Sequence, residues 1–226
     1  MLTWDLPVRL FHWTLVVAVL AAFVTNKLGI AYFKYHVWCG YTVIVLIAFR
    51  IIWGIIGTYH ARFWNFVRSP WRTFSYTRDW LRHREQPHAG HNPLGAWMVL
   101  LLLLTLFLQA LLGLFGNDEI FNLGPLYGYV SNERSLQLTS IHRQLAYWIL
   151  AAVVVHVIAV IAHRVFKKEN LVKPMITGYK DHDATNSSVG INTSRTWLAI
   201  VLVAVLSGTL AWIINHTPVA TLDAGF

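Results

Sequence analysis

Five long apolar segments constrain this chain more than any other feature. They cover residues 10–25, 35–56, 94–115, 141–165 and 197–214 of the 226. A helix needs about 20 mostly apolar residues to cross the hydrocarbon core of a bilayer, and each segment meets or approaches that length. In lipid a segment must satisfy its backbone hydrogen bonds internally, so we expect five spanning helices.

The composition agrees with a membrane protein, because 56% of the residues are hydrophobic and only 12% are charged. A soluble domain carries about 25% charged residues, so a soluble globular enzyme is excluded. We predict an all-α integral membrane protein. Residues 1–180 would form a four-helix transmembrane bundle, 181–195 a polar cytoplasmic linker that sets the fifth helix apart, and 196–226 the fifth transmembrane helix and a periplasmic tail.

The net charge of +8 indicates topology rather than nucleic-acid binding. Of the 18 Lys and Arg residues, 13 lie before the first segment, between the second and third, or between the fourth and fifth, if Arg164 at the end of the fourth segment is included. Cytoplasmic loops are enriched in Lys and Arg. We therefore expect a bacterial inner-membrane protein with a cytoplasmic N-terminus and a periplasmic C-terminus. The N-terminal stretch lacks a small-residue cleavage site, so the first segment is expected to be retained.

Cys39 is the single cysteine, which excludes an internal disulfide and covalent haem attachment through CxxCH. We expect its thiol to be a small apolar group within the second segment.

Four histidines within the apolar segments indicate function, because polar ligating groups in spanning helices are expensive. His142 and His156 lie 14 residues apart in the fourth segment, which places them on one helical face about 21 Å apart. His36 lies at the depth of His142, and His12 lies at the depth of His156. This arrangement predicts two sites for planar macrocycles, each with two axial His ligands, one near each membrane surface.

Three further residues fit this interpretation. Arg50 follows His36 by 14 residues, and its guanidinium would neutralise the propionates of a haem at the inner level. The alternative is that the Arg50 side chain reaches toward the cytoplasmic interface. Arg143 would do the same at the outer level. Gly40, one turn after His36, would leave room for a flat ring.

Several alternatives remain open at this point. A lone His in an apolar helix is more often a hydrogen-bonded core residue than a ligand. His163 shares the face of His156 and is expected to be interfacial, but it could replace His156 as a ligand. Zinc is disfavoured because it needs four converging ligands, usually with Cys or carboxylates.

Several motifs resemble a known family. They are PVRLFHW at residues 7–13, FRIIWG at 49–54, HARF at 60–63, GHNP at 90–93, the His142 and His156 pair, and MITGY at 175–179. As a set they resemble bacterial di-haem cytochromes b, in particular the b-type cytochrome subunit of membrane-bound nickel–iron hydrogenases, and more distantly the gamma subunit of membrane formate dehydrogenases. The resemblance covers residues 4–180.

The resemblance implies two non-covalent b-type haems. It implies that His12 and His156 ligate the cytoplasmic-side haem and that His36 and His142 ligate the outer one. It also implies electron transfer between a periplasmic redox partner and membrane quinone.

Asn92 matches a residue at the quinone site of the gamma subunit, and His91 would then be a proton relay because His titrates near neutrality. The alternative is that His91, Asn92 and Pro93 simply begin a helix.

Our prediction is an electron-transfer subunit of an oxidoreductase complex, with a hydrogenase or a c-type cytochrome as its partner and contacts with membrane lipid. A homo-oligomer is possible, and no nucleic acid is expected. One alternative is a stand-alone superoxide:quinone oxidoreductase whose outer pocket would use the cations Lys27, Lys34, Arg134 and Arg143. The other is a non-redox membrane protein.

Overall fold

The computed structural model describes residues 1–82, 90–120, 122–180 and 190–217 of the chain. Within these ranges, five helices are long and apolar enough to cross a membrane: α1 (Leu6–Lys27), α2 (Phe33–Ile56), α5 (Pro93–Leu114), α6 (Asn132–Phe166) and α8 (Thr196–Asn215). The prediction of an all-α integral membrane protein is therefore confirmed.

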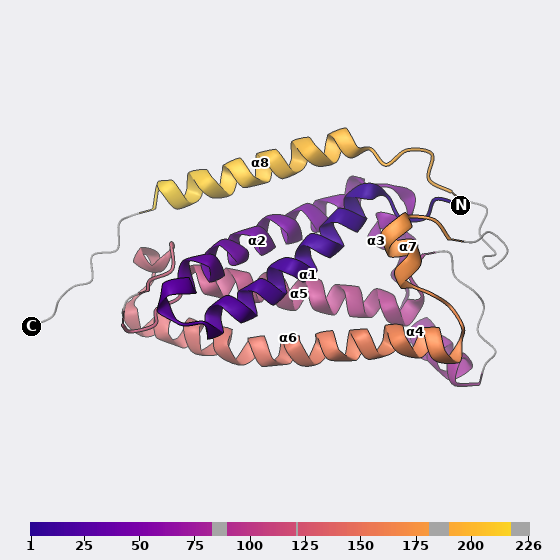
Figure 1. The fold of residues 1–226 in the computed structure, drawn as a ribbon, viewed down its shortest axis with the longest axis horizontal. Coiled ribbons are helices and arrows are strands. Elements are labelled where there is room, and N and C mark those ends of the chain that lie inside the picture. The colour runs from indigo at the N-terminus through magenta and orange to yellow at the C-terminus, as the bar shows by residue number, and fades with distance from the viewer. Residues whose placement is uncertain (83–89, 121, 181–189, 218–226) are drawn as a thin grey trace, which may run out of the picture.

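The long helices pack in a chain of neighbours. α1 packs along α2, α2 also packs against α5 and α8, and α5 packs against α6. Figure 1 shows α8 along one edge of the bundle and α6 along the opposite edge. The largest fully buried apolar side chains among the described residues are Trp53, Ile47 and Ile149. α6 is thus held mainly by α5, while α1 and α2 form the other half of the bundle.

α6 is much longer than its apolar segment. Its 35 residues begin at Asn132, nine residues before the expected start. Ser131 caps the helix by accepting a hydrogen bond from the Arg134 amide, and the following polar residues are helical. At 1.5 Å per residue the helix is about 52 Å long, so it extends well beyond the hydrocarbon core.

Short helices that hydropathy did not predict gather at one end of the bundle: α3 (Phe63–Phe66), α4 (Pro70–Leu81) and α7 (Val172–Thr177). The N-terminus lies at this same end in Figure 1. Thr73 of α4 is buried and accepts a hydrogen bond from Trp97 of α5 at 3.1 Å, whereas Trp71 and Phe74 of α4 are exposed. The cation-rich segments expected on one side of the membrane therefore lie at one end.

The segment expected to be a linker touches the rest of the protein where it is described. Residues 181–189 lie outside the described residues, and so do His83, His88 and His182. The Ile191 amide donates to the carbonyl of Leu2 at 3.0 Å. The Leu6 amide donates to Ser194 Oγ at 3.3 Å. Since α8 also packs along α2, the fifth helix is not set apart from the bundle.

Asp5 joins the two helices of the α1–α2 pair. Its side chain is 1% exposed, and its Oδ1 caps α1 by accepting the Val8 amide at 2.7 Å. Its Oδ2 accepts hydrogen bonds from Trp53 Nε1 at 3.0 Å and from Thr58 Oγ1. A buried carboxylate is costly unless its oxygens are hydrogen-bonded, and here both are. These bonds fix the start of α1 against the end of α2.

We predict that Asp5→Asn destabilises the protein by about 2–3 kcal/mol. The NH₂ group of the asparagine would face hydrogen-bond donors in place of an accepting oxygen, and the charge-assisted hydrogen bond to the carboxylate would be lost. Thermal unfolding in detergent measures the effect. Asp79→Asn is the matched control, because Asp79 forms an exposed pair with Arg78 at 3.4 Å, and such pairs contribute little. Equal melting temperatures for Asp5→Asn and the wild type would contradict the prediction.

Candidate functional site

His36 and His142 lie next to each other at the end of the bundle opposite α3, α4 and α7. The centroids of the two rings are 6.1 Å apart, and the ring planes are nearly perpendicular at 85°. His36 comes from the first turn of α2, and His142 comes from α6. The structure therefore brings together the two residues predicted to share the outer site.

Backbone carbonyls orient both rings. Nδ1 of His36 lies 2.9 Å from the carbonyl oxygen of Ala22, and Nδ1 of His142 lies 2.8 Å from that of Gln109. A carbonyl can only accept, so each Nδ1 carries the proton and donates it. Each Nε2 is left unprotonated with a free lone pair. This is the tautomer that a metal-bound histidine uses, with its other nitrogen held by a carbonyl.

The spacing of the rings fits a single metal ion between them. Two metal–nitrogen bonds of about 2 Å, together with about 1.1 Å from each Nε2 to its ring centre, separate two centroids by about 6 Å. The observed 6.1 Å agrees with this value. The residues present therefore fit a bis-His haem at the outer level.

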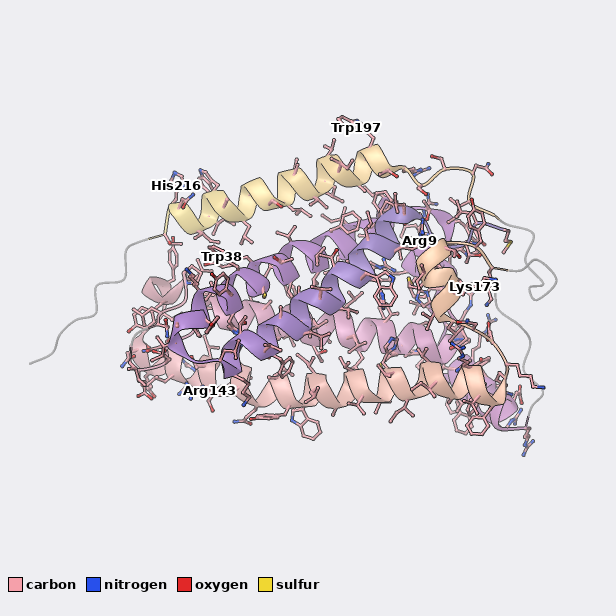
Figure 2. All side chains as sticks on the ribbon, in the orientation of Figure 1. Arg9, Trp38, Arg143, Lys173, Trp197 and His216 are labelled. Atoms are coloured by element: carbon pink, nitrogen blue, oxygen red, sulfur yellow. The ribbon has the colours of Figure 1, made fainter. Side chains whose placement is uncertain are left out.

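Glycines leave space beside these ligands. A Cβ on Gly113 of α5 would lie 3.1 Å from Cε1 of His142, so a larger residue would press on the ring. A Cβ on Gly40 would meet no atom within 4 Å, so there is open space beside His36 where we expected a flat ring. Gly113 was missed in the sequence because its role depends on the crossing of α5 and α6. Arg143 is exposed beside His142 at the outer end (Figure 2).

The second predicted pair is His12 of α1 and His156 of α6, and both residues are half-buried. Nδ1 of His12 is buried and has no hydrogen-bond partner among the described residues. The ring of Trp13 packs edge-on against His12, with centroids 5.0 Å apart. Unlike the rings of His36 and His142, the ring of His12 is not oriented by a hydrogen bond from Nδ1 among the described residues.

Arg50 adds a buried cation at this inner level. The side chain is 2% exposed, and its Nη1 has no hydrogen-bond partner among the described residues. Its Cζ lies 4.8 Å from the ring centroid of Phe63 and 6.0 Å from that of Phe66. A buried guanidinium with an unused donor is expected to need an anion, and a haem propionate would supply one.

His91 is packed between aromatic rings beside this cluster. Its ring centroid lies 4.6 Å from the rings of both Trp4 and Phe66. Burial, followed by the nearby charge of Arg50, lowers the pKa of His91 to about 3. The ring is therefore neutral at physiological pH.

Asn92 and His163 form a link between α5 and α6. Asn92 Oδ1 caps α5 by accepting the Gly95 amide at 2.7 Å, and Asn92 Nδ2 lies 3.2 Å from Nε2 of His163. Nδ1 of His163 donates to the Ala159 carbonyl at 3.0 Å. Both nitrogens of His163 are thus engaged and its ring is buried, which favours His156 as the ligand.

We predict that Asn92→Ala destabilises the protein by about 2 kcal/mol, because it removes the cap and the bond to His163. Asn92→Ser keeps a capping oxygen and should cost about 1 kcal/mol. Thermal unfolding of both variants measures the difference. Equal losses for Ser and Ala would show that the cap contributes nothing, and an Asn92→Ser variant as stable as the wild type would show that the bond to His163 contributes nothing.

Comparison with known proteins identifies relatives of the whole bundle. A family model described as prokaryotic cytochrome b561 matches residues 3–178, which include α1, α2, α5 and α6. A protein of Rhodobacter capsulatus, named as a probable Ni/Fe-hydrogenase B-type cytochrome subunit, is 24% identical over 215 residues, covering 78% of this chain and 80% of that protein. The probable Ni/Fe-hydrogenase 1 B-type cytochrome subunit of Escherichia coli K12 is 24% identical over 211 residues, covering 79% and 89%. No solved structure matches the chain.

Proposed function

Since the chain belongs to the prokaryotic cytochrome b561 family, it is a multi-pass membrane b-type cytochrome that transfers electrons, and we propose that it holds two haems and connects a periplasmic redox partner with membrane quinone. Membership of this family excludes the non-redox alternative. The observation that carries the proposal is the His36–His142 pair, whose ring centroids lie 6.1 Å apart and whose Nδ1 atoms both donate to backbone carbonyls.

In this proposal His36 and His142 hold the outer haem, and His12 and His156 hold the inner one. Each b-type haem, when bound, supplies an iron that takes up and releases one electron. The carbonyls of Ala22 and Gln109 make their imidazole ligands more basic by accepting from Nδ1. α6 carries one ligand of each pair and so fixes the two levels about 21 Å apart.

Arg50 has a separate role at the inner level. Its unpartnered Nη1 would donate to a propionate and so keep the guanidinium paired inside the bundle. Arg143 is the corresponding candidate at the outer level, where its exposure places it next to water or headgroups.

The quinone site is proposed beside the inner haem, near His91 and Asn92. His91 is neutral, and its buried Nδ1 has no partner among the described residues, so it is available to hydrogen-bond a quinone oxygen. Asn92 contributes indirectly, since its amide is used by the cap and by His163.

We propose the orientation of the chain in the membrane from the distribution of its cations, and the redox partner from the names of its relatives. The cation-rich end with α3, α4 and α7 is proposed to be cytoplasmic in a bacterial inner membrane, which puts the His36–His142 site on the periplasmic side. The curated relatives are named as hydrogenase subunits, which supports a hydrogenase-like donor; a c-type cytochrome is the other candidate.

We expect the purified protein to contain two b-type haems per chain. His36→Ala and His12→Ala should each retain one haem, and the double variant none, because each removes one ligand of a different site. The reduced-minus-oxidised spectrum and the haem-to-protein ratio measure this. His216→Ala is the control, because His216 only stacks on Trp212 at 4.8 Å and donates to the Trp212 carbonyl. A single haem in the wild type, or one retained in the double variant, would refute the assignment.

We expect His91→Phe to slow haem reoxidation by a soluble quinone at least tenfold, because an apolar ring removes the hydrogen bond to the quinone oxygen while filling the same space. Stopped-flow absorbance of the reduced protein measures the rate, and the haem content should stay at the wild-type value. An unchanged rate would place the quinone site elsewhere. Adding superoxide to the oxidised protein without a partner tests the stand-alone alternative, which requires rapid haem reduction.

A further inference from the structure

A small cleft lies at the cation-rich end, between the last turn of α6 and the helix α7. Its volume is about 220 Å³, and it is lined by Arg164, Asn170, Val172, Lys173, Ile176 and Thr177. None of these lining residues is acidic. The cleft lies apart from both histidine pairs.

The polar groups of the cleft favour an anion. Arg164 and Lys173 are both exposed, and neither forms an ion pair with the described residues. The neighbouring carboxylate of Glu169 is already bound to Lys180 at 2.7 Å. Asn170 Oδ1 accepts from the amides of Val172 and Lys173, at 3.1 Å each, which leaves the Asn170 amide group as a donor. The cleft therefore offers two cations and a donor to a negatively charged group.

The walls of the cleft are apolar toward the membrane. Ile176 lines the cleft and is 58% exposed. Ile161 is also exposed, and it lies three residues before Arg164 on the same face of α6, about 4.5 Å deeper along the helix. A soluble anion gains nothing from such a surface, whereas the acyl chain of a lipid would cover it.

We propose that this cleft binds the phosphate headgroup of an anionic phospholipid between Arg164 and Lys173, with an acyl chain along the Ile161 face of α6. Basic pockets beside spanning helices on the cytoplasmic side are suited to such headgroups. Arg164 supplies a planar fork of donors for the phosphate oxygens, and Lys173 supplies a compact charge.

The bound lipid would also hold α7 in place against α1. The Ile176 carbonyl accepts a hydrogen bond from Arg9 Nη1, and the Met175 carbonyl accepts one from Trp13 Nε1 at 3.2 Å. Figure 2 shows Lys173 of α7 and Arg9 of α1 at the same end of the molecule. Because Trp13 packs on His12, the lipid would stabilise the end of the bundle that carries the inner histidine pair.

The test is native mass spectrometry of the delipidated full-length protein, titrated with phosphatidylglycerol or phosphatidylcholine. We expect phosphatidylglycerol to bind the wild type at least tenfold more tightly. Arg164→Gln and Lys173→Gln should each weaken its binding about fivefold, and the double variant should bind both lipids equally. Arg164→Lys should retain most of the preference.

Arg72→Gln is the matched control, because it removes an exposed cation from α4 at the same end but outside the cleft. Its affinity for phosphatidylglycerol should equal that of the wild type. The visible haem spectrum and the lipid-free melting temperature establish that each variant is folded. The proposal is overturned if the wild type does not prefer phosphatidylglycerol, if Arg72→Gln weakens binding as much as Lys173→Gln, or if inorganic phosphate raises the melting temperature as much as phosphatidylglycerol does.

Discussion

The buried carboxylate of Asp5 is the interaction on which the rest of the bundle depends. It begins α1 by capping Val8, and it holds Trp53 near the end of α2. Since α1 carries His12 and α2 carries both His36 and Arg50, this contact helps to fix the relative position of these groups, together with the packing of α1 along α2. Burying a carboxylate to 1% exposure is costly unless its oxygens are hydrogen-bonded, and three donors bond them here.

A second constraint is the lack of water in the bilayer core. Every ring nitrogen there needs a partner supplied by the protein or by a ligand. The outer histidines use backbone carbonyls for one nitrogen and leave the other free, whereas His163 uses both and becomes part of the scaffold. A histidine in this bundle is thus either a candidate ligand or a structural residue, depending on which groups lie next to its ring nitrogens.

Much of the architecture could be predicted from the sequence because it depends on local properties. Five apolar segments predicted five helices, and the structure has them. The 14-residue spacing of His142 and His156 predicted that both lie on one face of the same helix. The pairing of His36 with His142 followed from depth alone, and the structure brings these residues together. Asn92 before Pro93 indicated a helix start, and the structure has one there.

The remaining features depend on contacts between distant parts of the chain. Hydropathy missed the first nine residues of α6 because they are polar, and it missed α4 and α7 because they are short. The burial of His91 requires Trp4 and Phe66, which lie 87 and 25 residues away in the sequence. The close approach of Gly113 to His142 depends on how two helices cross, which no single segment encodes.

The continuity of α6 has a consequence for the evolution of such proteins. In the proposed arrangement one unbroken helix carries a ligand of each haem, so the spacing of the two sites along α6 would be set by helix rise and not by any loop. The segment between α5 and α6 can then change to suit a new donor without altering that distance. A rigid-body tilt of α6 would instead move both candidate sites at once. Selection for the rate of electron transfer would therefore act on the residues that pack α6 against α5.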